Sequence, residues 1–456
     1  MDLYSKKSLE SFFGEEQNPM QSPAHHLSII AHQQMADQRD PQLSPERPSS
    51  TSVVHVSPPS PVSPWTLSPL RTPSPSLLYQ CIASLHRHEG NIFSIAVFKG
   101  IVFTGSESSR IRVWRQPEYV EREYLKTNSG EVRAILAYGN MLFTAHRDHK
   151  IRVWNVSVSE SFRSKKVATL PRRSPFLLFP RTNSQQHKGC ISCLAYYHAE
   201  GLLYTGSWDK MVKAWRVSDR RCIDSFQAHE DNVNAIVINQ EDGCVFTCSS
   251  DGSIKIWRRV FGESSHTLTM TLRFQPSPIN ALALSCSPTA DCFLYSGSSD
   301  GFINVWEKEG ISGRFSHGGY LHGHRFAVLC LVAIDKLVFS GSEDTTIRVW
   351  RREEGCCFHA CLAILDGHRG PVRCLAACLE MEKVVMGFLV YSASLDRTFK
   401  VWRVKVFQND TKVMSMEEDT ADKYDHKTKH SAMEYEMFPV LSPSWVEKKL
   451  QGSHLY

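Results

Sequence analysis

Short apolar runs of about five residues alternate with turn residues from about Leu77 to about Phe407. The segment 202–215 shows the pattern clearly: an apolar run ends in Thr-Gly-Ser, a turn follows at Asp209, and basic and apolar residues then alternate up to Trp215. Such alternation around a tight turn predicts a β-hairpin. A Trp preceded by Val, Ile or Ala closes seven units of this kind, at Trp114, Trp154, Trp215, Trp257, Trp306, Trp350 and Trp402. The chain is therefore predicted to be all-β, with one unit repeated seven times.

The seven units agree in register at three further positions. A hydroxyl residue stands ten residues before each Trp, at Thr104, Thr144, Thr205, Thr247, Ser296, Ser340 and Ser392. An Asp stands six residues before the Trp in six units, at Asp148, Asp209, Asp251, Asp300, Asp344 and Asp396, whereas the first unit has Ser108. A His lies upstream in five units, at His88, His187, His229, His324 and His368, where the second and fifth units have Asn128 and Gln275.

This spacing predicts a chain of hydrogen bonds inside each unit. The carboxylate in the turn can accept from the His, the His can reach the strand hydroxyl, and the hydroxyl can reach the indole N–H. Each such bond contributes on the order of 0.5–1.5 kcal/mol net. A structural role is therefore expected for His187, Thr205, Asp209, Trp215, His229, Asp251, Trp257, His324, Asp344, Trp350, His368, Asp396 and Trp402. A hydroxyl/His/Asp set that recurs around the structure makes no catalytic sense, so we expect no hydrolase and no enzyme.

A period of about 40–45 residues with a Gly-His-like start and a Trp-Asp-like end resembles the WD40 repeat. The resemblance covers residues 77–407 and implies a seven-bladed β-propeller with four strands per blade. The residue after the Trp departs from the family pattern, being Arg115, Asn155, Arg216, Arg258, Glu307, Arg351 or Arg403 and never Asp. The whole chain is similar to plant WD40 proteins of the JINGUBANG type in residues 206–218, in residues 228–235 and in a long insertion between the second and third repeats.

Two segments outside the Trp-ended units are also expected to be outer strands. The segment 81–88 has the spacing of the outer strands at 222–229 and 361–368, but it precedes the first Trp unit. It is therefore predicted to pair with the segment ending at Trp402 and to close the ring. Residues 162–170 are predicted to form the outer strand of the second blade, and the longer gap before Trp402 is interpreted as an expanded hairpin loop from Glu380 to Phe388. The basic, aromatic loop 171–181 is compatible with a nuclear-import or anion-binding patch, or with an ordinary mobile loop.

Both ends of the chain differ in composition from the repeats. Residues 1–76 are dominated by Ser and Pro from Pro41 onward and are expected to be a disordered tail. Their Ser-Pro and Thr-Pro pairs are either proline-directed phosphorylation sites or features of a solvated tail; the cluster comprises Ser57, Ser60, Ser63, Ser68, Thr72 and Ser74. Residues 408–456 are expected to form a second disordered tail, polar at first and apolar near 437–446.

Net charge, apolar runs and cysteine content restrict the expected cellular location and the classes of partner. The formal net charge of +5 over 456 residues gives little support for a nucleic-acid partner. The chain has no apolar run of about 18 residues and no apolar signal segment after Met1, so neither a membrane span nor secretion is expected. These features predict a protein of the cytoplasm and/or nucleus. There, the fourteen cysteines are expected to be reduced thiols.

The candidate binding residues lie where a propeller presents its upper rim around the central channel. By register these are Phe93, Arg133, Arg147, Trp208, Asn232, Asn234, Asn280, Glu343 and Arg373. Trp and Arg are residue types that anchor interfaces, and Trp208 breaks the pattern of its repeat position, so this rim is expected to bind a peptide segment of a partner. The alternative is that Trp208 folds over its own blade. The Arg residues after the Trp form either an anion-binding belt or a solvated edge.

The expected function is a non-enzymatic scaffold or adaptor, regulatory in signalling or transcription-factor control, that binds other proteins through its rims. Two alternatives are a substrate receptor of a cullin-type ubiquitin ligase and an RNA-associated WD40 protein. No repeat end has the Trp-Asp-x-Arg/Lys pattern associated with cullin docking. No metal, cofactor or small-molecule substrate is expected. Cys190 and Cys193 follow His187 at metal-ligand spacing but are interpreted as buried cysteines on an inner strand.

Overall fold

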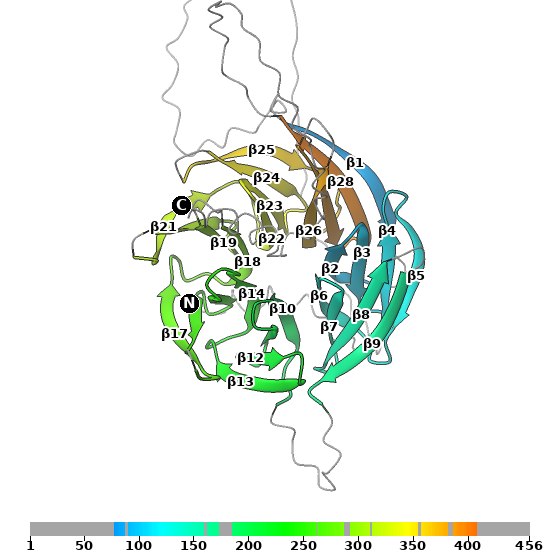
Figure 1. The fold of residues 1–456 in the computed structure, drawn as a ribbon. Coiled ribbons are helices and arrows are strands. Elements are labelled where there is room, and N and C mark those ends of the chain that lie inside the picture. Colours follow the sequence, from blue (N-terminus) through cyan, green and yellow to red (C-terminus); the bar gives the residue numbers. More distant parts are fainter. Residues whose placement is uncertain are drawn as a thin grey trace, which may run out of the picture. The chain divides into compact units, whose positions relative to one another are not determined.

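The structure is a computed structural model. It describes residues 77–86, 90–158, 162–172, 185–260, 262–286, 292–310, 312–353, 357–381 and 386–407. The two predicted tails, the candidate phosphorylation sites, His88 and most of the loop 171–181 lie outside the described residues. The described residues form 28 strands in seven four-stranded antiparallel sheets, which confirms the seven-bladed β-propeller. Figure 1 shows the sheets as a ring, with the first strand of each blade facing the centre and the fourth strand at the outer edge.

The strands of the first four blades follow the sequence order. Blade 1 consists of β2 (Ile92–Phe98), β3 (Ile101–Ser106), β4 (Arg110–Arg115) and β5 (Val120–Lys126). Blade 2 consists of β6 (Val132–Tyr138), β7 (Met141–His146), β8 (Ile151–Val158) and β9 (Phe162–Leu170). Blade 3 consists of β10 (Ile191–Tyr197), β11 (Leu202–Ser207), β12 (Met211–Arg216) and β13 (Arg221–Gln227). Blade 4 consists of β14 (Val233–Ile238), β15 (Val245–Ser249), β16 (Ile254–Arg259) and β17 (His266–Leu272).

The last blade combines both ends of the described chain. Blade 5 consists of β18 (Ile279–Cys286), β19 (Cys292–Ser298), β20 (Ile303–Lys308) and β21 (Phe315–Leu321). Blade 6 consists of β22 (Val328–Ile334), β23 (Leu337–Ser342), β24 (Ile347–Arg352) and β25 (His359–Leu365). Blade 7 consists of β26 (Val372–Met381), β27 (Met386–Ser394), β28 (Thr398–Val406) and β1 (Leu77–His86). β1 pairs with β28 from Leu77 opposite Val406 to His86 opposite Thr398, which confirms the predicted ring closure.

Two expectations about blade connections have different outcomes. β9 pairs with β8 along its whole length, so the outer strand predicted at 162–170 is confirmed. An expanded hairpin loop was expected between Glu380 and Phe388, but β26 and β27 continue pairing as far as Met381 opposite Met386. The insertion therefore lengthens the two strands. At the extended end, Glu380 of β26 reaches across β27 and holds Arg403 of β28 at 2.8–3.0 Å, which stabilises the longer pairing.

The core lies between adjacent blades. The second strand of each blade is completely or almost completely buried, as in β3, β11 and β23. Small residues there allow close packing: a Cβ on Gly206 would lie 2.6 Å from the Cys193 sulfur and 2.7 Å from Val233 of the next blade. The inner strands line an apolar cavity of about 160 Å³ along the axis, with Ala96 and Val237 among its walls. Burial of these apolar faces holds the ring together.

One cysteine pair does not fit the expectation of reduced thiols. Strand pairing places Cys286 directly opposite Cys292 at the outer end of the β18–β19 hairpin, with their Cα atoms 4.0 Å apart. The structure joins these two residues in a disulfide, so that expectation is wrong for this pair. The prediction rested on the expected cellular compartment, whereas the strand register brings these two thiols together. The other cysteines in the described ranges are free.

Candidate functional site

Every blade contains the predicted contact between its Trp and its strand hydroxyl. The indole Nε1 of each Trp donates to the hydroxyl oxygen ten residues earlier, at distances of 2.9–3.1 Å. The hydroxyl stands on the second strand and the Trp on the third, and both are buried. This bond therefore cross-links the two central strands of all seven blades.

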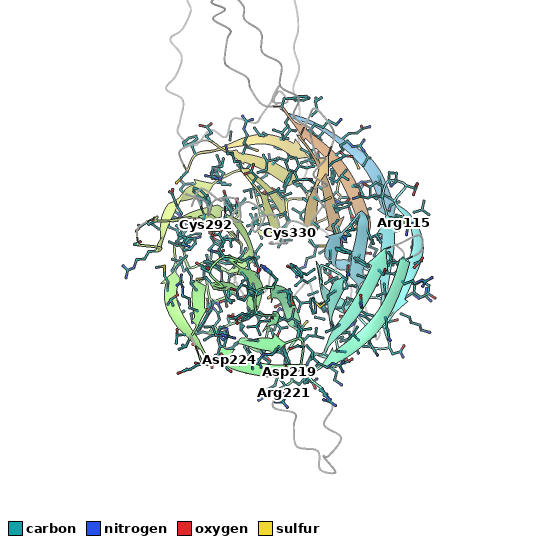
Figure 2. All side chains as sticks on the ribbon, viewed as in Figure 1. Arg115, Asp219, Arg221, Asp224, Cys292 and Cys330 are labelled. Carbon is teal, nitrogen blue, oxygen red and sulfur yellow. A yellow bond between two sulfur atoms is a disulfide. The ribbon has the colours of Figure 1, made fainter. Side chains whose placement is uncertain are left out.

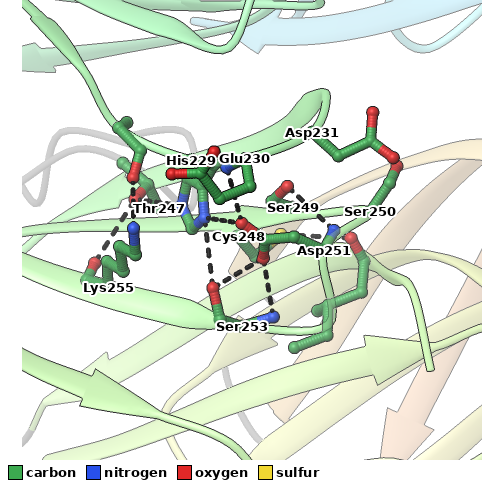
Figure 3. A network of polar contacts seen from close by, with 12 residues as sticks. His229, Glu230, Asp231, Thr247, Cys248, Ser249, Ser250, Asp251, Ser253 and Lys255 are labelled. Carbon is green, nitrogen blue, oxygen red and sulfur yellow. Dashed lines mark hydrogen bonds and ion pairs between the residues drawn. The ribbon is translucent and has the colours of Figure 1, made fainter. Parts of the chain in front are cut away.

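In four blades the contact continues to the His and the Asp. In blade 4, drawn in Figure 3, His229 Nε2 lies 2.8 Å from Thr247 Oγ1 and its Nδ1 lies 2.9 Å from Asp251. Blades 3, 6 and 7 repeat this arrangement with His187, His324 and His368. Because an ionised carboxylate only accepts, Nδ1 carries the proton and Nε2 accepts from the hydroxyl. Each hydrogen bond therefore runs in one direction, from Trp through hydroxyl and His to Asp.

The protonation states agree with this direction. Burial lowers the pKa of His187 and of His324, so both rings are neutral at physiological pH and Nε2 remains an acceptor. Burial by itself raises the pKa of Asp209 and Asp344, but the hydrogen bonds from the His rings and from backbone N–H groups outweigh it and hold the pKa below the usual range. A neutral His and an ionised Asp are what the hydrogen-bond chain requires.

Blade 2 supplies its own substitute for the missing His. His146 on β7 is completely buried, and its Nε2 lies 2.8 Å from the Thr144 hydroxyl, where other blades use the His of the connecting loop. Asp148 then bonds Arg152 at 2.7–3.1 Å instead of a His. Burial, with the nearby Arg152 charge, lowers the pKa of His146 to about 3. The sequence signal was present, because His146 stands at a position where all six other units have Ser.

The entrance of the central channel is formed by a repeated β-bulge. The pairing of the first and second strands shifts by one residue at the same point in all seven blades. The extra residues, here called the bulge ring, are Phe93, Arg133, Ser192, Asn234, Asn280, Leu329 and Arg373. A bulge redirects side chains, and here it repeats at the inner end of every blade. Figure 2 shows Cys330, which follows Leu329, near the axis and Arg115 at the periphery.

Five of the nine predicted rim residues belong to this ring, and the prediction missed Ser192 and Leu329. Both stand five residues after the His position of their repeat, as the other members do, so register alone would have found them. Asn234 donates to the Ile279 carbonyl at 2.8 Å, and Asn280 donates to the Val328 carbonyl at 3.1 Å. These amides bridge neighbouring blades, so much of their hydrogen-bonding capacity is used within the fold.

The arginines of the rim are arranged differently. The Arg133 guanidinium lies 4.4 Å from the centre of the Phe93 ring and forms an ion pair with Glu131. Arg147, whose side chain is 75% exposed, reaches the same carboxylate at 3.4 Å. One acidic side chain thus serves two arginines, and the Arg133–Phe93 pair joins a charge to an aromatic face.

Arg373 is half-buried and forms no hydrogen bond or ion pair with the residues that the structure describes. Burial, with a smaller contribution from the Arg133 charge, lowers the pKa of Arg373. The guanidinium also interacts electrostatically with Cys190 of blade 3 and Cys330 of blade 6. Only a position toward the channel axis is close to groups from all these blades.

Three further rim candidates, Trp208, Asn232 and Glu343, form backbone hydrogen bonds within the fold. Trp208 is half-buried and interacts within the propeller, and its backbone N–H donates to the Cys190 carbonyl at 3.0 Å. Asn232 accepts from the Ser250 N–H at 3.1 Å, and the Glu343 N–H donates to Ala327 at 2.9 Å. Their backbones therefore serve the turns that carry them.

The Arg belt near the other rim is largely engaged by carboxylates and an aromatic ring of the propeller. Arg216 contacts Asp219 at 3.5 Å, Arg258 contacts Asp242 at 3.3 Å, and Arg259 contacts Glu200 at 2.6 Å. Arg352 is buried with its guanidinium 4.0 Å from the Phe293 ring. Neutralisation by neighbours favours the interpretation as a charged edge over an anion-binding belt.

Two sequence patterns, the His-x2-Cys-x2-Cys segment and a Gly-x-Ser-x-Gly segment, are not arranged as a metal site or a catalytic site in the described residues. His187 is engaged by Asp209. Cys190 precedes β10 and is half-buried, so its interpretation as a buried cysteine of the inner strand is wrong. Cys193 lies on β10 and is also half-buried, and burial raises the pKa of its thiol to about 12. Within the described ranges, no group of His, Cys, Asp or Glu is placed to hold a metal ion. Gly297–Gly301 has the Gly-x-Ser-x-Gly spacing of a nucleophile elbow, but it joins two strands and Ser299 bonds Asn280 at 3.1 Å.

The comparison with known families decides the classification. The WD40 profile, described as WD domain, G-beta repeat, matches residues 79–115, 180–216, 220–258, 266–307, 316–351 and 359–403, which together exceed half of the chain. The chain belongs to the WD40 repeat family. The matches omit residues 116–179, which include all four strands of blade 2 of this WD40 protein. That blade has Asn128 and His146 in place of the usual His arrangement, together with a longer outer strand.

Similarity to individual proteins is partial. The chain is 26% identical over 151 residues to an uncharacterized WD repeat-containing protein of Schizosaccharomyces pombe, covering 32% of this chain and 40% of that one. It is 30% identical over 126 residues to Periodic tryptophan protein 2 of Arabidopsis thaliana, covering 27% and 13%. It is 40% identical over 70 residues to a p21-activated protein kinase-interacting protein 1-like protein of Danio rerio, covering 15% and 19%. The matches span 40% or less of these relatives.

WD40 propellers typically are non-enzymatic scaffolds that bind other proteins. Among the described residues, no helix is long and apolar enough to span a membrane.

Proposed function

We propose that this WD40 protein is a non-enzymatic adaptor that captures a peptide segment of a partner protein at the bulge ring. The single observation that carries the proposal is Arg373, a half-buried guanidinium that has no partner among the described residues at the channel entrance. Desolvated arginines and aromatic rings supply much of the binding energy at protein interfaces. Arg133, stacked on Phe93, provides a second anchor two blades away.

The proposed binding is tested by affinity capture with the full chain. The double variant Arg133→Gln/Arg373→Gln should lose partners that the wild type retains, because both anchors lose their charge. Arg351→Gln, on the third strand of blade 6, is a matched control and should retain them. A melting temperature equal to that of the wild type separates lost binding from unfolding. If the double variant captures the same proteins in the same amounts, the bulge ring is not the binding site.

We also infer that the role is regulatory, in signalling or transcription-factor control, and that the protein works in the cytoplasm and/or nucleus. The Ser-Pro-rich segment before the propeller supports regulation by phosphorylation. Similarity to the JINGUBANG type in residues 206–218 and 228–235 supports a plant protein of that kind. Imaging of a fluorescent fusion tests the location, and phosphopeptide mapping of residues 57–74 tests the modification.

A further inference from the structure

Blade 5 replaces the polar network of its turn with aromatic side chains. In blades 4, 6 and 7, the hydroxyl two residues after the turn Asp bonds that Asp at 2.6 Å; these residues are Ser253, Thr346 and Thr398. In blade 5 this position is Phe302, and the His of the connecting loop is Gln275. Asp300 and Gln275 are both exposed, whereas Asp344 in the next blade is almost buried. The corner of blade 5 thus lacks the network that closes the corners of blades 3, 4, 6 and 7.

Five rings gather at this corner in a continuous row. Phe274 stacks on His317 with ring centres 4.0 Å apart, and Phe302 stacks on His322 at 4.8 Å. Tyr320 connects the two pairs, 6.4 Å from Phe274 and 5.2 Å from Phe302. These five residues are here called the blade-5 aromatic row. Tyr320 is 56% exposed and Phe274 is 45% exposed, so the row presents large apolar side chains to solvent.

The row rests on regular structure. Phe302 immediately precedes β20, and His317 and Tyr320 belong to the outer strand β21, where Tyr320 pairs with Asn304. His317 Nε2 contacts the buried Asn304 side chain at 3.1 Å, which fixes its ring. Gly318 and Gly319 separate His317 from Tyr320, and a Cβ on Gly319 would meet nothing within 4 Å. The φ of +131° at Gly319 favours glycine, so this stretch of backbone stays uncovered between two rings.

The charges around the row restrict the class of ligand. None of its five members is an acid, a lysine or an arginine. Exposed Arg273 and Arg325 stand next to Phe274 and close to His322 in sequence, and exposed Asp300 stands next to Phe302 in the turn. Binding of single-stranded nucleic acid needs a groove of positive charge beside the stacking rings. Two arginines with a carboxylate at the same corner do not supply it, so an uncharged ligand is favoured.

We propose that the blade-5 aromatic row binds a proline-rich segment of a partner protein in the polyproline II conformation. Such segments dock on aromatic-lined grooves and need little ordering, because the helix is already formed. Residues three apart in this helix lie roughly 9 Å apart on one side. The distance between the Phe274 and Phe302 rings cannot exceed the sum of their distances to the Tyr320 ring. A spacing of roughly 9 Å lies within this limit. The row is a second site, separate from the bulge ring.

Fluorescein-labelled decaproline is the probe, titrated with the full chain and followed by fluorescence anisotropy. Tyr320→Ala and Phe274→Ala should each weaken binding about ten-fold or more, as expected when an interface anchor is truncated. Tyr320→Phe should bind as the wild type does, since it keeps the ring. Phe358→Ala is the matched control, because Phe358 is 72% exposed and belongs to the connection between β24 and β25. Arg133→Gln/Arg373→Gln should leave decaproline binding unchanged, so the two proposed sites fail independently.

Three results would overturn this assignment. The first is wild-type chain that does not bind decaproline. The second is that Tyr320→Ala and Phe274→Ala bind decaproline with affinities within two-fold of the wild type and have unchanged melting temperatures. The third is salt-dependent binding of a twelve-nucleotide single-stranded RNA that both substitutions abolish, with no binding of decaproline; the row would then be a base-stacking platform.

Discussion

Ser340 and Ser296 occupy the same repeat position in neighbouring blades but differ in their hydrogen bonds. Both are completely buried. Ser340 Oγ accepts from Trp350 Nε1 at 2.9 Å and lies 2.7 Å from His324 Nε2. Ser296 Oγ accepts from Trp306 Nε1 at 2.9 Å, and its blade has Gln275 in the His position. Replacing each by Ala removes the same atom from two matched sites, so the difference measures the link to the His.

The magnitude follows from the number of buried groups that lose a partner. An unsatisfied buried donor or acceptor costs roughly 1–3 kcal/mol. Ser296→Ala leaves the Trp306 Nε1 without a partner, so we expect a loss of about 1–3 kcal/mol in the free energy of unfolding. Ser340→Ala leaves both Trp350 Nε1 and His324 Nε2 without partners. It should therefore be more destabilising than Ser296→Ala by about 1–3 kcal/mol.

Urea unfolding, followed by tryptophan fluorescence and far-ultraviolet circular dichroism, measures the two losses. Agreement between the two signals is needed before a free energy is assigned. Ser340→Thr is the control that keeps a hydroxyl, which is the residue type found at Thr205 of blade 3. Equal losses for Ser340→Ala and Ser296→Ala would show that the His adds nothing to the Trp–hydroxyl bond.

Two further predictions concern the whole propeller. Burial lowers the pKa of His146 to about 3. Below about pH 6.5 the unfolded chain therefore binds more protons than the folded one, and the free energy of unfolding decreases as the pH is lowered. The His146 contribution is roughly 2 kcal/mol between pH 8 and pH 5; the His146→Gln variant should show a shallower dependence of its urea midpoint on pH, and an unchanged slope would refute the assignment. Deletion of residues 77–88 removes β1 and the buried Leu77, which alone is worth about 2–5 kcal/mol. Its melting temperature should drop, and a full-length value would disprove that β1 is needed to close the ring.

The fold was predictable because its defining contacts lie at fixed sequence offsets within one hairpin. A hydroxyl ten residues before a Trp falls on the adjacent strand, and all seven pairs meet at 2.9–3.1 Å. Ring closure was predictable for the same reason, since residues 81–88 repeat the spacing of two other outer strands. By contrast, the sequence marks His146 of blade 2 only as a departure from Ser at its repeat position, and its contact with Thr144 on the same strand does not follow from the repeat offsets.

Register indicated where the rim candidates lie along their strands, but it could not indicate which of them have partners in the fold. Register placed Asn234, Asn280 and Arg373 at the channel entrance, where the bulge ring has them. It gave no information about which of them find partners in the next blade. Asn234 and Asn280 do, whereas Arg373 does not among the described residues. Such contacts depend on how the blades are arranged around the axis, and that arrangement follows from the closed ring as a whole.

The surface of blade 5 also could not be predicted from the repeat pattern. Gln275 and Phe302 look like two separate deviations in the sequence, yet together they remove the His link and the turn hydroxyl from one corner. Aromatic pairs contribute about 0.5–1.5 kcal/mol each beyond their burial, similar to the hydrogen bonds they replace. Stability alone would be served equally well by rings that lie buried. Tyr320 and Phe274 instead remain about half exposed beside an uncovered Gly319, and the fold offers no reason for that exposure. A ligand that covers the row does.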